Sequence, residues 1–201
     1  MFEEPNKEEK GKVEKISSVF ASIGKFIFSF IETIVVALVI SVVLYLFIMT
    51  PHEVVGRSMY PTYEDGEFLM ANKVQYQISE PKRGDVIIFK YSETQDFIKR
   101  IIGLPGETVG LQDGEIYIDG KILNESAYLD EAIYTNGSDY LHEGETITVG
   151  QDEYFVCGDN RNHSSDSRTF GPISVENIKA KAWIVYYPFS NFRLAVHEQY
   201  D

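Results

Sequence analysis

The hydrophobic and polar positions divide the chain into two parts with different patterns. Residues 33–52 contain no Asp, Glu, Lys or Arg, and apolar residues extend this run back to Phe26, interrupted by Glu32. As a helix, residues 26–49 would be about 36 Å long, which exceeds the roughly 30 Å of membrane hydrocarbon. A core helix of a soluble domain is a poorer explanation, because residues 35–40 are apolar on every face. The pattern predicts one transmembrane helix at residues 26–49.

Beyond Pro51 the pattern changes to short apolar or alternating segments separated by turn residues, which is typical of β-strands. An Asp-Gly turn at residues 119–120 lies between two such segments and predicts a hairpin. No long stretch has helical periodicity, so this part of the chain is predicted to be mainly β. The strands are expected at residues 67–71, 85–89, 96–102, 108–110, 115–122, 146–149, 154–156 and 181–187.

One segment within the β-rich part lacks a regular pattern. Residues 124–145 are rich in Asn, Glu, Ser, Gly and Asp, with scattered Tyr. We expect this segment to belong to an inserted loop or subdomain that does not carry the chemistry.

The basic residues near the start of the sequence predict how the helix crosses the membrane. Five lysines precede the apolar run, whereas Arg57 is the one basic residue among the next twenty. Because cytoplasmic segments carry an excess of Lys and Arg, residues 1–25 are predicted to be cytoplasmic, and the chain after the helix to be extracytoplasmic. A cleaved signal peptide fits less well, because the run is too long and no small-x-small site follows at residues 49–53. The charged residues 1–16 are expected to be disordered.

The charge of the chain excludes some partners. The formal net charge is −13, and five of the 18 basic and six of the 31 acidic residues precede residue 51, so the rest carries −12. An acidic protein is poorly suited to bind nucleic acid. Attachment to a lipid bilayer is therefore expected to come from the helix and apolar surface, not from lipid charge. The single cysteine, Cys157, permits no intrachain disulfide and follows an apolar segment, so it is expected to be buried.

Two residues have the chemistry of a nucleophile and its base. Ser58 lies in a constrained turn, residues 56–62, with the sequence Gly-Arg-Ser-Met-Tyr-Pro-Thr. Strand alternation places Lys99 between Phe97 and Ile101 on one face. Burial among such neighbours lowers the pKa of a lysine and lets it accept a proton near neutral pH. Taken singly, Ser58 also fits an ordinary turn serine, and Lys99 also fits a solvent-facing lysine of an edge strand.

Other bases and metal chemistry find less support in the sequence. The four histidines are His52, His142, His163 and His197. None of them lies in a setting that positions a base, although His163 is close to a polar cluster. No metal-ligand spacing such as His-Glu-x-x-His occurs, so neither a metal nor a cofactor is expected. That polar cluster, residues 158–168, includes Asp159 and an Asp-Ser-Arg triplet. It fits either a polar surface loop or an ordered loop that supports a site.

Four motifs, taken together and in order, resemble those of the bacterial type I signal peptidases. Residues 56–62 match Gly-x-Ser-Met-x-Pro-Thr, and residues 83–86 match Arg-Gly-Asp-Val. Residues 99–106 match Lys-Arg-x-Ile-Gly-Leu-Pro-Gly, and residues 158–168 match Gly-Asp-Asn-Arg-x-x-Ser-x-Asp-Ser-Arg. The single apolar helix and short middle insert resemble the smaller, Gram-positive-style members.

The resemblance implies a fold and a membrane enzyme. It implies an antiparallel-sheet catalytic domain, residues 51–106 and 154–201, with a small inserted β subdomain at 107–153. It implies a single-pass protein of the plasma membrane that removes signal peptides from exported preproteins. A specialised processing enzyme and an inactive, membrane-tethered binding protein with this fold are the alternatives. A self-cleaving repressor fits poorly, because it would need a DNA-binding segment and no membrane helix.

The resemblance also assigns roles to residues. Ser58 is the nucleophile and Lys99 the base, without histidine. Ser164 orients the lysine amine, and Asp166 with Arg168 forms a supporting ion pair, next to Asp159. The backbone N–H of Ser58 serves the oxyanion hole, but a serine found two positions earlier in some members is Gly56 here. The walls of the substrate pocket are expected to include Val54, Val55, Gly56, Met59, Phe97 and Ile98.

Overall fold

The computed structural model describes residues 7–130, 133–198 and 200, and divides the chain into two compact units, Met1–Leu46 and Phe47–Asp201. The described part of the first unit lies in helix α1, Lys7–Phe47, whose last residue belongs to the second unit. Its segment Ser22–Tyr45 has a mean hydropathy of 2.7 and is not buried, so its length and composition permit it to cross a membrane. The helix begins earlier than expected, so the prediction of disorder is wrong for residues 7–16. Lys and Glu, which dominate those residues, are strong helix formers.

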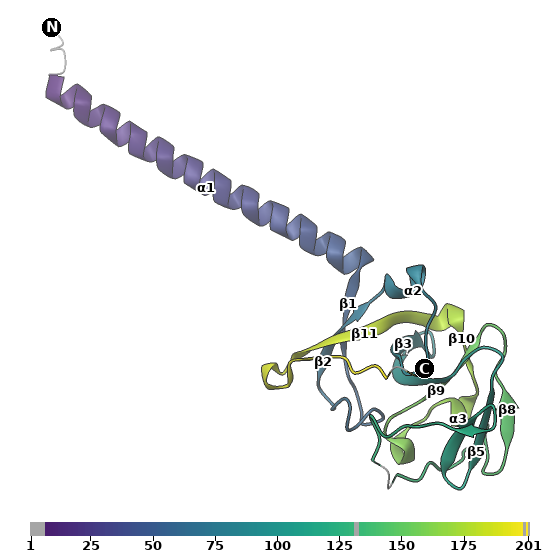
Figure 1. Cartoon of the computed structure of the whole chain (residues 1–201). Helices are drawn as coiled ribbons and strands as arrows, with labels where there is room; N and C mark the ends of the chain where they lie inside the picture. The colour runs from purple at the N-terminus through teal and green to yellow at the C-terminus, as the bar shows by residue number, and fades with distance from the viewer. Residues whose placement is uncertain (1–6, 131–132, 199, 201) are drawn as a thin grey trace. The chain divides into compact units, whose positions relative to one another are not determined.

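The second unit contains two antiparallel sheets (Figure 1). The larger sheet has the strand order β1-β2-β11-β3-β4-β9-β10, with β12 paired to β11. The smaller sheet has the order β7-β6-β5-β8. The prediction of a mainly β fold with antiparallel sheets after an apolar helix is confirmed. The strands are β1 Met49–Glu53, β2 Phe68–Asn72, β3 Val86–Lys90, β4 Asp96–Gly103, β5 Thr108–Gln112, β6 Glu115–Ile118, β7 Lys121–Ile122, β8 Thr146–Thr148, β9 Glu153–Cys157, β10 Ile173–Ser174, β11 Ile178–Tyr187 and β12 Arg193–Leu194.

Short helical turns connect these strands. The turns are α2 Gln75–Ile78, α3 Ser167–Phe170 and the 3₁₀ turns Arg161–His163, Val175–Asn177 and Phe189–Asn191. The smaller sheet takes its strands from one continuous part of the chain. All four strands of the smaller sheet lie between Thr108 and Thr148. The exact limits of an inserted subdomain at 107–153 stay a prediction.

Strand β1 was not predicted. The apolar run was expected to continue as helix to residue 49, yet α1 ends at Phe47 and residues Met49–Glu53 pair with β2. Pro51 lies in the middle of this strand. Proline has no backbone N–H to donate to a neighbouring strand. Because β1 is an edge strand with a neighbour on one side only, this loss is tolerated.

The register of β4 leaves one of its edges partly open. On one side β4 pairs with β3 from Asp96 to Arg100. On the other side β9 pairs with β4 only from Arg100 onward, where Arg100 lies opposite Cys157. Among the described residues, no strand therefore pairs with the outer edge of residues 96–99.

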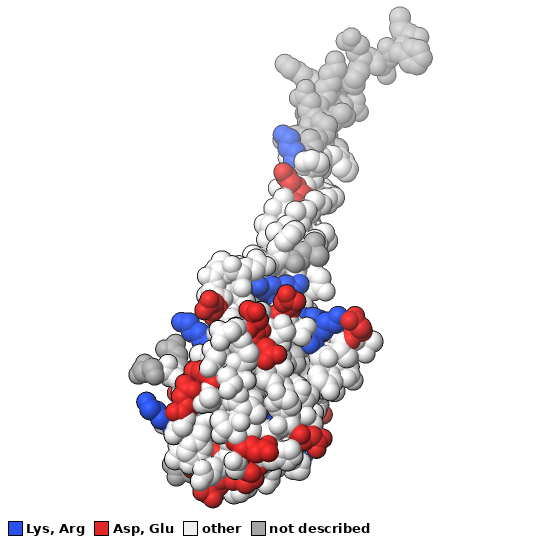
Figure 2. Space-filling model, turned by 90° about the vertical axis from the view of Figure 1, so that its right-hand side faces the viewer, with Lys and Arg blue, Asp and Glu red and all other residues white. Residues whose placement is uncertain are grey.

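Apolar side chains fill the space on both faces of the larger sheet. One cluster joins β2, β3 and β11 to the segment after β1 and includes Val54 and Met59. Another joins β4 and β9 to the smaller sheet, and it includes Phe155 and the buried Cys157. Acidic side chains outnumber basic ones on the face of the molecule seen in Figure 2, in line with the sequence composition.

Candidate active site

The structure brings Ser58 and Lys99 into contact. Lys99 Nζ donates a hydrogen bond to Ser58 Oγ over 2.8 Å and another to the carbonyl oxygen of Ile98 over 2.9 Å. Lys99 comes from the part of β4 with the open edge, and Ser58 from the turn that follows β1 and Val54. The two residues are 41 positions apart in sequence.

Burial controls the chemistry of Lys99. Its side chain is 3% exposed, and its Nζ lies 5.0 Å from the ring centroid of Phe97, the neighbour on the same face of the strand. Burial lowers the pKa of Lys99 to about 8, although the charges of Asp166 and Asp159 act in the opposite direction. The amine is thus neutral in a useful fraction of molecules near neutral pH.

The turn that carries Ser58 is fixed by its neighbours on both sides. Met59 and Tyr63 are each 1% exposed and anchor the turn in the core. Gly56 has φ +89°, in the left-handed region that favours glycine, and its N–H donates to Asp65 Oδ1 over 2.7 Å. A serine at position 56 would be strained, and the Gly56 N–H is already engaged by Asp65. The nearest backbone donor to a developing oxyanion is therefore expected to be that of Ser58.

The polar loop at residues 158–168 packs directly on the Ser58 turn. The N–H of Asn160 donates to the Ser58 carbonyl over 3.0 Å, and Asn160 Nδ2 donates to the Arg57 carbonyl over 2.9 Å. A Cβ on Gly158 would lie 2.4 Å from the Ser58 carbonyl oxygen and 2.2 Å from Ser164 Oγ. Both approaches are closer than a side chain permits, so glycine at 158 lets the loop reach the turn.

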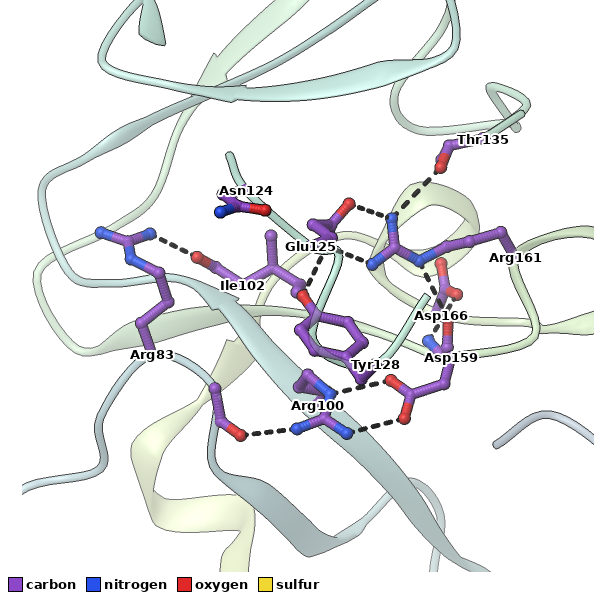
Figure 3. Close-up of polar contacts among 12 residues, drawn as sticks. Arg83, Arg100, Ile102, Asn124, Glu125, Tyr128, Thr135, Asp159, Arg161 and Asp166 are labelled. Atoms are coloured by element: carbon purple, nitrogen blue, oxygen red, sulfur yellow. Dashed lines mark hydrogen bonds and ion pairs between the residues drawn. The ribbon is translucent and has the colours of Figure 1, made fainter. Parts of the chain in front are cut away.

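Asp159 joins the Ser58 turn to the strand of Lys99. Its carboxylate accepts bonds from Arg100 Nε over 2.9 Å and Nη2 over 2.7 Å, and from the Thr62 hydroxyl over 2.5 Å. Figure 3 shows this carboxylate at the side of the Arg100 guanidinium, which lies against the ring of Tyr128, with 4.0 Å between Cζ and the ring centroid. Arg100 was not predicted as a site residue. Its position next to Lys99, in a strand with an apolar run on either side, was the available signal.

Asp166 and Arg168 form a second buried pair. Arg168 Nε and Nη2 donate to the Asp166 carboxylate over 2.9 and 2.8 Å, and the Gly158 N–H adds a bond of 2.9 Å. Burial alone raises the pKa of Asp166, but these bonds and the Arg168 charge outweigh it, and the pKa is lowered. Asp166 therefore stays ionised and holds the loop close to Lys99.

Ser164 lies near Ser58 without the expected hydrogen bond to Lys99. Its hydroxyl is near enough to the Asp166 carboxylate to contribute to the lowered pKa. Within the described part of the chain, however, Ser164 Oγ is buried without a hydrogen-bond partner of ordinary geometry, and no bond joins it to Lys99. Its role in orienting the lysine amine stays a prediction.

The irregular segment 124–145, which was expected not to carry the chemistry, contacts the polar loop at residues 158–168. Arg161 of the polar loop pairs with Glu125 and donates to Thr135 Oγ1 over 3.2 Å and to the Gly158 carbonyl over 3.1 Å (Figure 3). Tyr128 also donates to Glu125, over 2.6 Å. The insert therefore supplies the counter-charge for a buried arginine of the polar loop.

A groove leads to Ser58 and Lys99. The expected pocket residues Val54, Val55, Gly56, Phe97 and Ile98 line it together with Ser58 and Lys99. Met59 is instead buried in the core beneath the turn. No cluster of three or more His, Cys, Asp or Glu that could hold a metal ion occurs among the residues that the structure describes.

Comparison with known proteins identifies the family. The family model described as "Signal peptidase, peptidase S26" matches residues 27–187. The chain belongs to the signal peptidase family S26. The resemblance to bacterial type I signal peptidases that the four motifs indicated is confirmed, and the chain is a peptidase of that type.

Individual relatives match over most of the chain. Signal peptidase IB of Staphylococcus aureus (strain COL) is 34% identical over 180 residues, which are 84% of this chain and 94% of the relative. Signal peptidase I of Bacillus amyloliquefaciens is 35% identical over 195 residues, which are 93% and 98% of the two chains. A solved structure of a signal peptidase I from Enterococcus faecalis V583 is 32% identical and covers 52% of this chain and 97% of its own, with a TM-score of 0.43.

Proposed function

We propose that this S26 peptidase removes signal peptides from exported preproteins with Ser58 as nucleophile and Lys99 as general base. The observation that carries the proposal is the 2.8 Å contact between Lys99 Nζ and Ser58 Oγ, made by a lysine that is 3% exposed. Nucleophilic catalysis by serine needs an adjacent base, and a desolvated lysine is such a base.

The reaction proceeds through an acyl-enzyme. Neutral Lys99 takes the proton of Ser58 Oγ while Oγ attacks the carbonyl carbon at the cleavage site. The resulting oxyanion is stabilised by the Ser58 N–H. Lys99 gives the proton to the leaving amine of the mature chain, and the C–N bond breaks. Lys99 then takes a proton from a water that attacks the ester, and returns it to Ser58 Oγ as the signal peptide leaves with a carboxylate.

The open edge of β4 supports binding of an extended signal peptide. Within the described part of the chain, residues 96–99 have no strand on their outer side, and segment 53–56 lines the same groove. Val54 uses its N–H and C=O to bond Glu67 and Gly66, so the alternation of a strand turns the N–H and C=O of Val55 the other way. A peptide between the two edges gains main-chain bonds, and the apolar walls from Val55 and Ile98 suit small side chains before the cleavage site.

The apolar helix supplies the membrane anchor. Its length and composition fit a single-pass protein, and the five lysines before residue 26 place the N-terminal side in the cytoplasm by the positive-inside rule. The peptidase unit then lies outside, where the cleavage sites of exported preproteins emerge.

Mass spectrometry of cleavage products tests the proposed function. The full chain in detergent, incubated with a panel of preproteins, is expected to cut each once, after a small residue with a second small residue two positions before it. A matched preprotein with Arg at the residue before the cleavage site is expected to remain uncut. Cleavage of a single preprotein among many would favour a specialised processing enzyme, and no cleavage would contradict the proposal.

The activity is expected to depend on pH through Lys99. Because its pKa is lowered to about 8, kcat/KM on a neutral peptide should rise with pH and level off above about 8. Below that pH it should fall about tenfold per unit, since the base must be neutral. A plateau that begins only near the pKa of a free lysine, about 10.4, would show that Lys99 is not a desolvated base.

The same shift predicts that stability also rises with pH, but over a higher pH range than the activity. The folded pKa lies below the unfolded one, so between about pH 8 and 10.5 the unfolded state binds more protons, and the free energy of unfolding rises with pH. The full effect is about 3 kcal/mol. Denaturation of the Lys99→Met variant, which lacks this group, should not show the rise.

A further inference from the structure

The Ser58 turn is part of a segment, residues 54–67, whose two ends are joined. The Val54 N–H donates to the Glu67 carbonyl over 2.7 Å, and the Gly66 N–H donates to the Val54 carbonyl over 2.8 Å. These bonds close the segment at its base, so the residues between them form a loop. The place of Ser58 in the groove therefore depends on the contacts that hold the rest of this loop.

Thr62 holds the loop through two groups, its hydroxyl and its carbonyl. The hydroxyl donates to Asp159 over 2.5 Å, and the carbonyl accepts from Arg193 Nη2 over 2.8 Å. Arg193 lies in β12, 131 positions away in sequence, and outside the four motifs that resemble the family. Because Thr62 follows Ser58 closely in the same turn, both contacts limit the movement of the nucleophile.

The Arg193 guanidinium is itself held by the base of the loop. Its Nη1 and Nη2 donate to the two oxygens of the Glu67 carboxylate, each over 2.6 Å, and Glu67 is 2% exposed. The guanidinium also lies 5.6 Å from the ring centroid of Tyr63, and Nη1 donates to the Asn191 carbonyl over 3.0 Å. A planar guanidinium can bond a carboxylate at two points and still reach another acceptor. Arg193 thus connects the base of the loop to Thr62.

Catalysis by a serine is sensitive to small displacements of the nucleophile. A misplacement of about 1 Å can lower the rate about 100-fold, even when the change that causes it is far from the reacting atoms. We propose that Arg193 is a positioning residue for the peptidase reaction, because its bond to the Thr62 carbonyl fixes the loop that presents Ser58 to Lys99. This inference rests on the proposed function. A purely structural role, in which Arg193 only neutralises Glu67, is the alternative that the experiment must exclude.

Arg193→Lys separates the two roles. The lysine keeps a positive charge beside the buried Glu67, so Tm should change little, but it lacks the fork that bonds this carboxylate and the Thr62 carbonyl together. The full chain would be assayed in detergent, at a temperature where circular dichroism shows it to be completely folded. There kcat for preprotein cleavage should fall about tenfold, and KM should stay within about twofold, since the groove walls are unchanged. A purely structural role predicts an unchanged kcat for the folded variant.

Two further variants complete the test. Asn191→Ala removes a hydrogen bond of 3.1 Å to Glu67 Oε1 but leaves the bond from Arg193 to Thr62 in place, so kcat should be unchanged. Arg193→Met with Glu67→Leu leaves neither charge of the pair unpaired, and it should show the low kcat even if Arg193→Lys does not fold. An undiminished kcat in a folded variant of Arg193, or an equal loss in Asn191→Ala, overturns the inference alone. Failure of the unmodified chain to cut any preprotein overturns the proposed function and this inference with it.

Discussion

Ser58→Ala is expected to lower kcat for preprotein cleavage by at least about 10⁴-fold, because loss of a nucleophile removes the covalent route. The hydroxyl is half-buried and contacts Lys99 Nζ, so its removal leaves the fold intact. Cleavage would be followed by gel shift of a preprotein with the full chain in detergent. Binding of the same preprotein should persist, since the groove walls are unchanged. Cleavage at an undiminished rate would refute the assignment of Ser58.

Lys99→Met should cause a loss of the same order, with the double variant hardly worse than either single one, because the two residues act as a unit. The free energy of unfolding at pH 7 is expected to hold or rise, since a buried ammonium is replaced by an apolar chain of similar length. Lys90→Met, on the neighbouring strand β3, is the matched control and should retain activity. Additive losses in the double variant would show that the two residues do not work together.

The apolar and polar pattern of the sequence was sufficient to predict those helices and strands whose burial is the same along the whole segment. The apolar helix is exposed on all sides over residues 22–45, and β3 is buried at four consecutive residues. The proximity of Ser58 and Lys99 was also predictable, but only through the resemblance carried by four motifs. Strand alternation alone placed Lys99 on an apolar face and gave it no partner.

The supporting charges were not predictable, because they depend on contacts between segments distant in sequence. Alternation assigns Arg100 to the face opposite Lys99, and there its side chain is covered by Asp159 and the ring of Tyr128, which lie far from it in sequence. Glu125 lies in a segment without periodicity, and its partner Arg161 is 36 positions away. Neither the helix and strand propensities of the residues nor the spacing of apolar positions predicts such an ion pair.

Loss of the Asp159 carboxylate is expected to have the largest effect on stability. Asp159 and Arg100 are both completely buried and form a two-point ion pair. Asp159→Ala would leave the guanidinium buried without its counter-charge, which costs about 3–5 kcal/mol. For a unit of this size that corresponds to a fall in Tm of about 10 °C or more. Glu93→Ala, which removes an exposed partner of Lys90, is the matched control and should leave Tm unchanged.

Replacement of both Asp159 and Arg100 tests whether Asp159 matters only as the counter-charge of Arg100 or also for the position of Ser58 and Lys99. In Asp159→Leu with Arg100→Met no charge is left uncompensated, so much of the stability should return. The Thr62 hydroxyl, however, still loses the carboxylate that ties the Ser58 turn to the loop. We therefore expect thermal denaturation to recover while kcat stays well below that of the unmodified chain. Recovery of both would show that Asp159 matters only for stability, because a structural role alone predicts that activity follows Tm.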